Sequence, residues 1–205
     1  MPTIPKLLKT GSYYHIFNRG VEKREIFLDD SYYQRFIKTL DYYQRPQPIK
    51  LSFHLKETEK PESENGGNRL VSVLCYCLMP NHYHLILKQL EDNGITKFMN
   101  DISNSYTRYF NTRLKRSGHL FQGGFKSKLI GSEESFLQVS RYIHLNPQDL
   151  HPEGGKQFIE TYPYSSYRLF LGHVNKYGPT LRGDIIEYIN SAKEYQGFVE
   201  SKIGL

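Results

Sequence analysis

Two histidines separated by one residue stand at the start of an apolar run. The segment reads Met79-Pro80-Asn81-His82-Tyr83-His84-Leu85-Ile86-Leu87. In a β-strand, successive side chains point to opposite faces of the sheet, so His82 and His84 would share one face, about 6.6 Å apart along the strand. Two imidazoles placed in this way could bind one metal ion, and the alternate residues would anchor the strand in a core. The spacing therefore indicates a metal site on a sheet face that stays open to a substrate.

Two structural interpretations of the same residues stay open at this point. The pair could be two half-buried histidines without a metal. Alternatively, Cys75 and Cys77 precede the pair with the same alternation and could join His82 and His84 in a closed structural zinc site. That site requires the turn at Pro80-Asn81 to bring the two short pairs together.

A predicted helix carries a second group of polar residues. Ser132 is a good N-cap, and Pro147 ends the helix because the residue before a proline avoids helical angles. Gln138, Tyr142 and Asn146 follow one another at intervals of four residues, which places them on one face of the helix. Tyr142 and Asn146 can therefore point at the same place.

The charge balance favours a polyanionic partner. The 205 residues include 27 Lys and Arg against 21 Asp and Glu, which gives a net charge of +6. Residues 102–132 contain no acidic residue. The basic residues of this stretch are Arg108, Arg113, Lys115, Arg116, Lys126 and Lys128. Because acids are not interspersed as on ordinary surfaces, we expect a phosphate-binding strip, and the 17 Tyr and 12 Phe offer rings for base stacking.

The expected location of the protein is the cytoplasm. The two cysteines, two positions apart, cannot form a disulfide framework, which fits a reducing compartment. Residues 1–11 have no apolar core of signal-peptide length, and no run is long enough to span a membrane.

The order of predicted elements is strand, helix, possible strand, strand, strand, helix, strand, helix, which contains the core pattern strand-helix-strand-strand-helix-strand. The strands are predicted at 13–18, 70–78, 83–87 and 119–130, and the helices at 29–45, 95–114 and 132–146. This order is typical of an α+β ferredoxin-like or RNA-recognition-like sandwich, with helices on one face of an antiparallel sheet and the other face free. We expect one domain over residues 1–150 and an extension over 151–205 packed on it.

Less regular segments complete the prediction. Residues 49–55 are a possible strand, and 57–68 is polar and reads as a mobile surface loop. The extension contains an aromatic loop at 162–167 and a final helix at 184–199. The apolar spacing from Ile95 to Phe110 makes Tyr106 and Tyr109 core residues rather than catalytic ones.

Several motifs in this order resemble the single-tyrosine HUH transposases, in particular the REP-associated tyrosine transposases, over nearly the whole chain. The matching segments are Tyr14–Gly20, Cys77–Leu85, Leu120–Lys126, Ser140–Pro147 and Tyr162–Tyr167. Many relatives have Arg where this chain has Gly124, and the middle residue of the histidine pair is usually apolar, whereas Tyr83 is polar at its tip. The resemblance also makes Cys75 and Cys77 packing residues.

The resemblance implies a mechanism. His82, His84 and Asn146 would bind a divalent metal ion, Mg²⁺ or Mn²⁺, and Tyr142 would be the nucleophile. The chain would cleave and rejoin single-stranded DNA through a 5′-phosphotyrosine and recognise hairpin ends. The expected DNA-binding residues are Asn18, Arg19, Arg108, Arg113, Arg116, Gln122, Lys126 and Lys128.

Some questions stay open at the level of sequence. A non-catalytic nucleic-acid-binding module on the same sandwich would need only the basic strip and the aromatic residues. The strand register does not decide whether His15 faces the site. The sequence contains no long exposed apolar helix that would argue for a dimer, so we expect a monomer. We also expect no membrane partner and no nucleotide cofactor.

Overall fold

A four-stranded antiparallel sheet forms the centre of the protein, with the strand order β2-β3-β1-β4. The computed structural model describes residues 7–46, 68–173 and 191–203. The strands are β1 (Tyr13–Arg19), β2 (Val71–Met79), β3 (His82–Gln89) and β4 (Lys126–Ile130). The predicted α+β sandwich is therefore confirmed, and β2 and β3 form an antiparallel hairpin.

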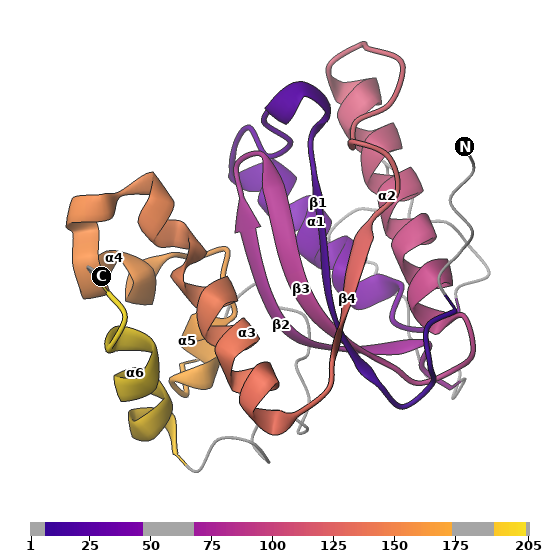
Figure 1. Cartoon of the computed structure of the whole chain (residues 1–205). Coiled ribbons are helices and arrows are strands. Elements are labelled where there is room, and N and C mark those ends of the chain that lie inside the picture. Colours follow the sequence, from indigo (N-terminus) through magenta and orange to yellow (C-terminus); the bar gives the residue numbers. More distant parts are fainter. Residues whose placement is uncertain (1–6, 47–67, 174–190, 204–205) are drawn as a thin grey trace.

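Two helices cover one face of the sheet, namely α1 (Asp30–Tyr42) and α2 (Gly94–Arg113) (Figure 1). Asp29 caps the N-terminus of α1, because its carboxylate accepts a hydrogen bond from the backbone N–H of Ser31 at 2.8 Å. The apolar stripes of both helices pack on alternate residues of β1 and β3. The buried residues at this contact include Ile16, Phe36, Leu40, Leu85, Leu87, Phe98 and Ile102. Tyr106 is fully buried here, as predicted.

The opposite face is only partly free, which differs from the expectation of an open face. A second core joins β2 to α3 (Glu133–Leu145) and to the short helices after it. These are η2 (Asn146–Leu150), η3 (Pro152–Gly154), α4 (Gly155–Thr161), α5 (Tyr167–Phe170) and α6 (Ala192–Glu200). Figure 1 shows them gathered beside β2, while β1 and β4 stay uncovered on this face. The physical reason lies in β2, whose nine residues are all buried and therefore need a layer on both faces.

An irregularity in β2 lets this strand contribute side chains to both cores. The pairing with β3 shifts between Val73 and Cys75, so Leu74 is an extra residue on this strand. Val71 and Val73 lie in the first core, whereas Leu74, Cys75 and Cys77 lie in the second. Both thiols are buried, as the interpretation of these cysteines as packing residues requires.

The predicted strand over 119–130 is too long. Only Lys126–Ile130 pairs with β1 as a ladder, and Phe121 makes a single antiparallel pairing with Gly20. Gly123 has a φ of +73°, a left-handed conformation that favours glycine, and its N–H bonds back to the carbonyl of Phe121 at 2.9 Å. This turn ends the extended segment and reorients the chain before β4.

Several predictions fall outside the described residues. The possible strand at 49–55 lies there, and so does the loop at 57–68 apart from Asn68. The final helix predicted over 184–199 is observed as α6 from residue 192, and residues 184–190 are outside the described part. None of the helices in the described ranges combines the length and the apolar character that a membrane span requires.

Candidate active site

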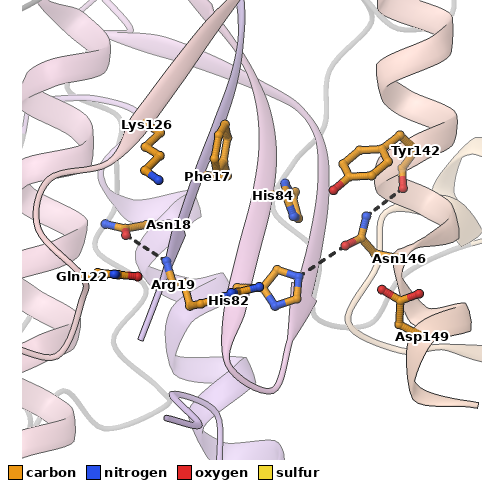
Figure 2. Close-up of a pocket in the computed structure, with 10 residues that line it drawn as sticks. All are labelled: Phe17, Asn18, Arg19, His82, His84, Gln122, Lys126, Tyr142, Asn146 and Asp149. Carbon is orange, nitrogen blue, oxygen red and sulfur yellow. Dashed lines mark hydrogen bonds between the residues drawn. The ribbon is translucent and has the colours of Figure 1, made fainter. Parts of the chain in front are cut away.

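A cavity of about 360 Å³ opens where β1 ends and β3 begins, on the face opposite α1 and α2. Its lining residues are Phe17, Asn18, Arg19, His82, His84, Gln122, Lys126, Tyr142, Asn146 and Asp149 (Figure 2). The structure thus brings the two histidines, Tyr142 and Asn146 together, along with four of the predicted DNA-binding residues.

The histidine pair occupies the positions that strand alternation predicted. Tyr83, between them, is fully buried in the first core, so His82 and His84 point to the other face. Their ring centroids lie 5.2 Å apart, with the ring planes nearly perpendicular at 88°. The ring of Tyr142 approaches from α3, 5.4 Å from the ring of His84 (Figure 2).

The end of α3 fixes the side chain of Asn146. Pro147 has no N–H, and the backbone N–H of Asn146 bonds to the carbonyl of Ile143 instead of continuing the α-helical pattern. The freed carbonyl of Tyr142 accepts a bond from Nδ2 of Asn146 at 2.8 Å. Because Nδ2 is the donor, Oδ1 must be the atom that faces Nε2 of His82, at 3.3 Å.

A second amide holds His82 from its other side. Nδ2 of Asn81 donates to the carbonyl of Lys23 at 3.2 Å, which directs Oδ1 toward Nδ1 of His82, at 2.6 Å. The turn that presents this carbonyl depends on Gly20, because a Cβ there would lie 2.3 Å from the carbonyl oxygen of Arg24.

His15 also belongs to the site, which the sequence left open. It lies on the same face as the histidine pair, its side chain is 7% exposed, and its Nε2 lies 2.8 Å from Nδ1 of His84. Burial, with the nearby charge of Lys128 as a smaller cause, lowers the pKa of His15 to about 4.

Burial also keeps the two paired histidines neutral. It lowers the pKa of His84 to about 3, aided by the neighbouring His15, His82 and Arg19. Burial likewise lowers the pKa of His82, against the opposing effect of the hydrogen bond to Asn146. Neutral imidazoles are the form that binds a metal ion.

The geometry around His82 fits a cation. Two amide oxygens, from Asn81 and Asn146, face the two ring nitrogens, yet a neutral imidazole has only one N–H. One nitrogen–oxygen contact therefore brings two lone pairs together unless a positive ion lies between them. The separation of 3.3 Å on the Asn146 side suits two neighbouring ligands of one small divalent ion, which lie about 3 Å apart.

The zinc interpretation does not fit the described part of the chain. The thiols of Cys75 and Cys77 lie in the second core, where Cys75 contacts His144, away from the open face. Within the described ranges, no three His, Cys, Asp or Glu side chains are grouped to hold a metal ion. The site instead combines two histidines with an amide oxygen.

The predicted DNA-binding residues divide into two groups. Asn18, Arg19, Gln122 and Lys126 line the cavity, and Lys128 follows on β4, opposite His15 in the sheet. Arg108, Arg113 and Arg116 are absent from the lining and belong to α2 and the turn after it. Arg113 bonds to Ser31 and Tyr109, at 2.7 and 2.6 Å, so it is engaged with the helix layer.

Two lining residues were missed at the sequence level. Asp149 follows Asn146 by three residues, which is one turn of the 3₁₀-helix that begins there. Phe17 alternates with His15 on β1, and its ring stacks against His84 at 5.7 Å between centroids. The period of each element could have identified both residues once the face that carries the histidine pair was known.

The buried histidines predict how stability depends on pH. The pKa of His144 is lowered to about 3 by burial, like that of His84. Below the ordinary value of about 6.5, the unfolded chain binds protons that the folded protein excludes, so the free energy of unfolding falls as the pH falls. For His144 alone the slope approaches about 1.4 kcal/mol per pH unit. Urea unfolding of metal-free protein at pH 7, 6 and 5 measures this, and a constant free energy would contradict the neutral assignment.

Comparison with known proteins agrees with this architecture. The family model described as "Transposase IS200 like" matches residues 9–146, which include β1, the histidine pair, Tyr142 and Asn146. A search of curated proteins gave no match. Among solved structures, a REP-associated tyrosine transposase bound to a REP hairpin is similar, with a TM-score of 0.57 and 14% identity, over 90% of this chain and 93% of that chain. That likeness shows a shared fold, and the match to the family model over most of the chain places this protein in the IS200-like transposase family.

Proposed function

We propose that this chain cleaves and rejoins single-stranded DNA beside a hairpin, in a metal-dependent reaction with Tyr142 as the nucleophile. The observation that carries the proposal is the convergence of Tyr142 with the Nε2–Oδ1 contact between His82 and Asn146. A non-catalytic binding module would have no use for such a cation site beside an exposed tyrosine.

His82, His84 and Asn146 would hold Mg²⁺ or Mn²⁺. The bound ion would supply Lewis-acid stabilisation of the charge that develops on the scissile phosphate. Asp149 lines the same cavity and would add a negative charge that favours cation binding there. The donor set of two imidazoles and oxygen atoms suits such an ion, since the oxygen ligands favour Mg²⁺ or Mn²⁺.

Tyr142 is placed to act on a phosphate at this cavity. Its side chain is 53% exposed, and its ring packs nearly perpendicular to that of His84, with 5.4 Å between the centroids. The phenol oxygen would attack phosphorus and lose its proton, while the bond from phosphorus to the 3′ oxygen breaks. The products are a 5′-phosphotyrosine and a free 3′-hydroxyl, and attack by a 3′-hydroxyl reverses the step and rejoins a strand.

The cationic side of the cavity would hold the DNA backbone. Arg19 and Lys126 line it, while Asn18 and Gln122 add amide donors and acceptors (Figure 2). The REP-associated relative was solved on a REP hairpin, and this supports a hairpin as the DNA for this chain as well.

The proposal is tested with a pool of single-stranded hairpins that carry randomised flanking sequences. Labelled DNA is incubated with the protein and Mn²⁺, Mg²⁺ or EDTA, and covalent complexes are separated on denaturing gels. We expect a protein–DNA adduct with either metal and none in EDTA. Salt-sensitive binding of the pool without any adduct would contradict cleavage and favour the non-catalytic module.

The division of the basic residues gives a quantitative prediction. A hairpin from the pool that forms the covalent adduct serves as the ligand. Each of Arg19→Ala and Lys126→Ala should weaken its binding several-fold, and should reduce the slope of log affinity against log salt concentration by about 0.7. Lys97→Ala serves as the matched control, because Lys97 is exposed on α2, outside the cavity lining. Fluorescence anisotropy at several salt concentrations measures both quantities. Equal slopes for Lys126→Ala and Lys97→Ala would show that the cavity does not bind the backbone.

A further inference from the structure

We propose that Asn81 and His15 are positioning residues, which hold His82 and His84 with the proton on Nδ1 and the lone pair on Nε2. Neither residue is a candidate metal ligand. The inference rests on the proposed function for the purpose that the two Nε2 atoms serve, namely to bind a cation, and the His15 part also uses cation binding to choose between two proton positions.

The Asn81 part follows from the orientation of two amides. Nδ2 of Asn81 donates to the carbonyl of Lys23, so its Oδ1 faces Nδ1 of His82 and can only accept a hydrogen bond. Nδ2 of Asn146 donates to the carbonyl of Tyr142, so the Oδ1 of Asn146 can also only accept.

The two distances decide where the single proton of His82 lies. The contact on the Asn81 side is 2.6 Å, and the contact on the Asn146 side is 3.3 Å. Bare lone pairs repel far more strongly at the shorter distance, so the proton belongs on Nδ1, between His82 and Asn81. Nε2 then presents its lone pair to the cavity, beside the oxygen of Asn146.

His15 performs the same task for His84 from the neighbouring strand. The contact of 2.8 Å between Nε2 of His15 and Nδ1 of His84 can hold one proton. If His84 donates, its Nε2 keeps a lone pair. If His15 donates, the proton of neutral His84 must lie on Nε2, where it blocks a cation. Cation binding therefore selects the arrangement in which His15 accepts.

Packing holds the accepting ring in place. β1 pairs with β3 so that Phe17 lies opposite His84, and His15 precedes it on the same face. The ring of His15 lies 5.0 Å from that of Phe17 and 5.0 Å from that of His84, between centroids. A hydrogen bond from a second residue to the outer nitrogen of a metal-binding histidine fixes its tautomer and orientation.

The Asn81 part is tested by NMR on metal-free, ¹⁵N-labelled full-length protein at pH 7. Long-range ¹H–¹⁵N spectra distinguish protonated from bare ring nitrogens, and His82→Gln assigns the signals. We expect the proton of His82 on Nδ1 in the wild type and on Nε2 in Asn81→Leu, where Asn146 can accept it. A wild-type proton on Nε2, or a tautomer unaffected by Asn81→Leu, would overturn this part.

The His15 part is tested by the affinity for Mn²⁺, measured from the electron paramagnetic resonance signal of the free ion. His15→Leu should weaken binding about 10-fold or more, because outer partners of metal ligands are worth about 10–100-fold in affinity. His15→Gln should restore most of it, since its Oε1 can accept from Nδ1 of His84. His119→Leu, at an exposed position, is the matched control and should bind as the wild type does.

The outcomes separate this inference from the proposed function. Equal Mn²⁺ affinity in His15→Leu and the wild type would overturn the role of His15, and so would a loss that Gln does not restore. Wild-type protein that binds no Mn²⁺ would contradict the proposed metal site and the His15 part together. The position of the His82 proton in metal-free protein tests the role of Asn81, whether or not the wild type binds Mn²⁺.

Discussion

Replacing Tyr142 by phenylalanine is expected to abolish covalent capture of hairpin DNA while leaving the fold and DNA binding unchanged. The substitution removes one hydroxyl group from a side chain that is 53% exposed. Among the described residues this hydroxyl has no hydrogen-bond partner, so its loss should change the free energy of unfolding by no more than about 0.5 kcal/mol. Without it, no atom of the ring can form a bond to phosphorus.

The rate of adduct formation is measured in a single turnover with a hairpin that forms the covalent adduct, on denaturing gels. Fluorescence anisotropy measures the affinity for the same DNA. Tyr109→Phe is the matched control, because Tyr109 lies on α2, on the opposite side of the sheet. We expect an adduct with the control at the wild-type rate and none with Tyr142→Phe, at equal DNA affinity. An adduct that survives Tyr142→Phe would assign the nucleophile to a different tyrosine.

The second large effect is expected from the histidine pair. His82→Ala removes the nitrogen that faces Oδ1 of Asn146, and His84→Ala removes the neighbouring ring. Each change takes one of three protein ligands from the proposed metal site. Mn²⁺ affinity should therefore fall about 100-fold or more, the upper end of the loss expected for an outer partner or beyond it, and adduct formation should fall with it.

Titration with Mn²⁺ and single-turnover cleavage measure the two losses, and anisotropy checks that the hairpin still binds. His119→Ala is the matched control, because it removes an exposed imidazole outside the proposed metal site. High concentrations of Mn²⁺ should partly restore cleavage by His82→Ala, because the other ligands remain. Full activity of both variants in EDTA would exclude a role for the metal.

The local geometry of the site follows from the sequence. The period of two along β3 places His82 and His84 on one face, and the spacing of four along α3 places Tyr142 and Asn146 together. The side-chain cap that orients Asn146 follows from Pro147, which ends the regular helix. These features depend only on neighbours in the chain.

The features that the sequence did not predict depend on contacts between distant segments. The meeting of α3 with the open face follows from the second core, in which residues after position 150 pack against β2. The place of His15 follows from its register with β3, which no local pattern fixes. The turn at Gly123 shortens the last strand because a left-handed residue interrupts the ladder.

The basic residues show the same limit. The acid-free stretch from 102 to 132 reads as one strip in the sequence, but α2 packs on the face opposite the histidines. Arg113 therefore contacts the helix layer, whereas Lys126 on β4 reaches the cavity. A continuous run of charge along the chain is thus divided between the two faces of the sheet.

Cleavage is expected to leave Tyr142 covalently joined to the 5′ phosphate of the cleaved single strand. The most direct measurement is mass spectrometry of peptides from the protein–DNA adduct formed with Mn²⁺, after nuclease digestion of the DNA. We predict a nucleotide joined through its 5′ phosphate to the peptide that contains Tyr142, and a free 3′-hydroxyl on the released strand. A nucleotide on any other residue would exclude Tyr142 as the nucleophile, and a linkage through a 3′ phosphate would exclude a 5′-phosphotyrosine.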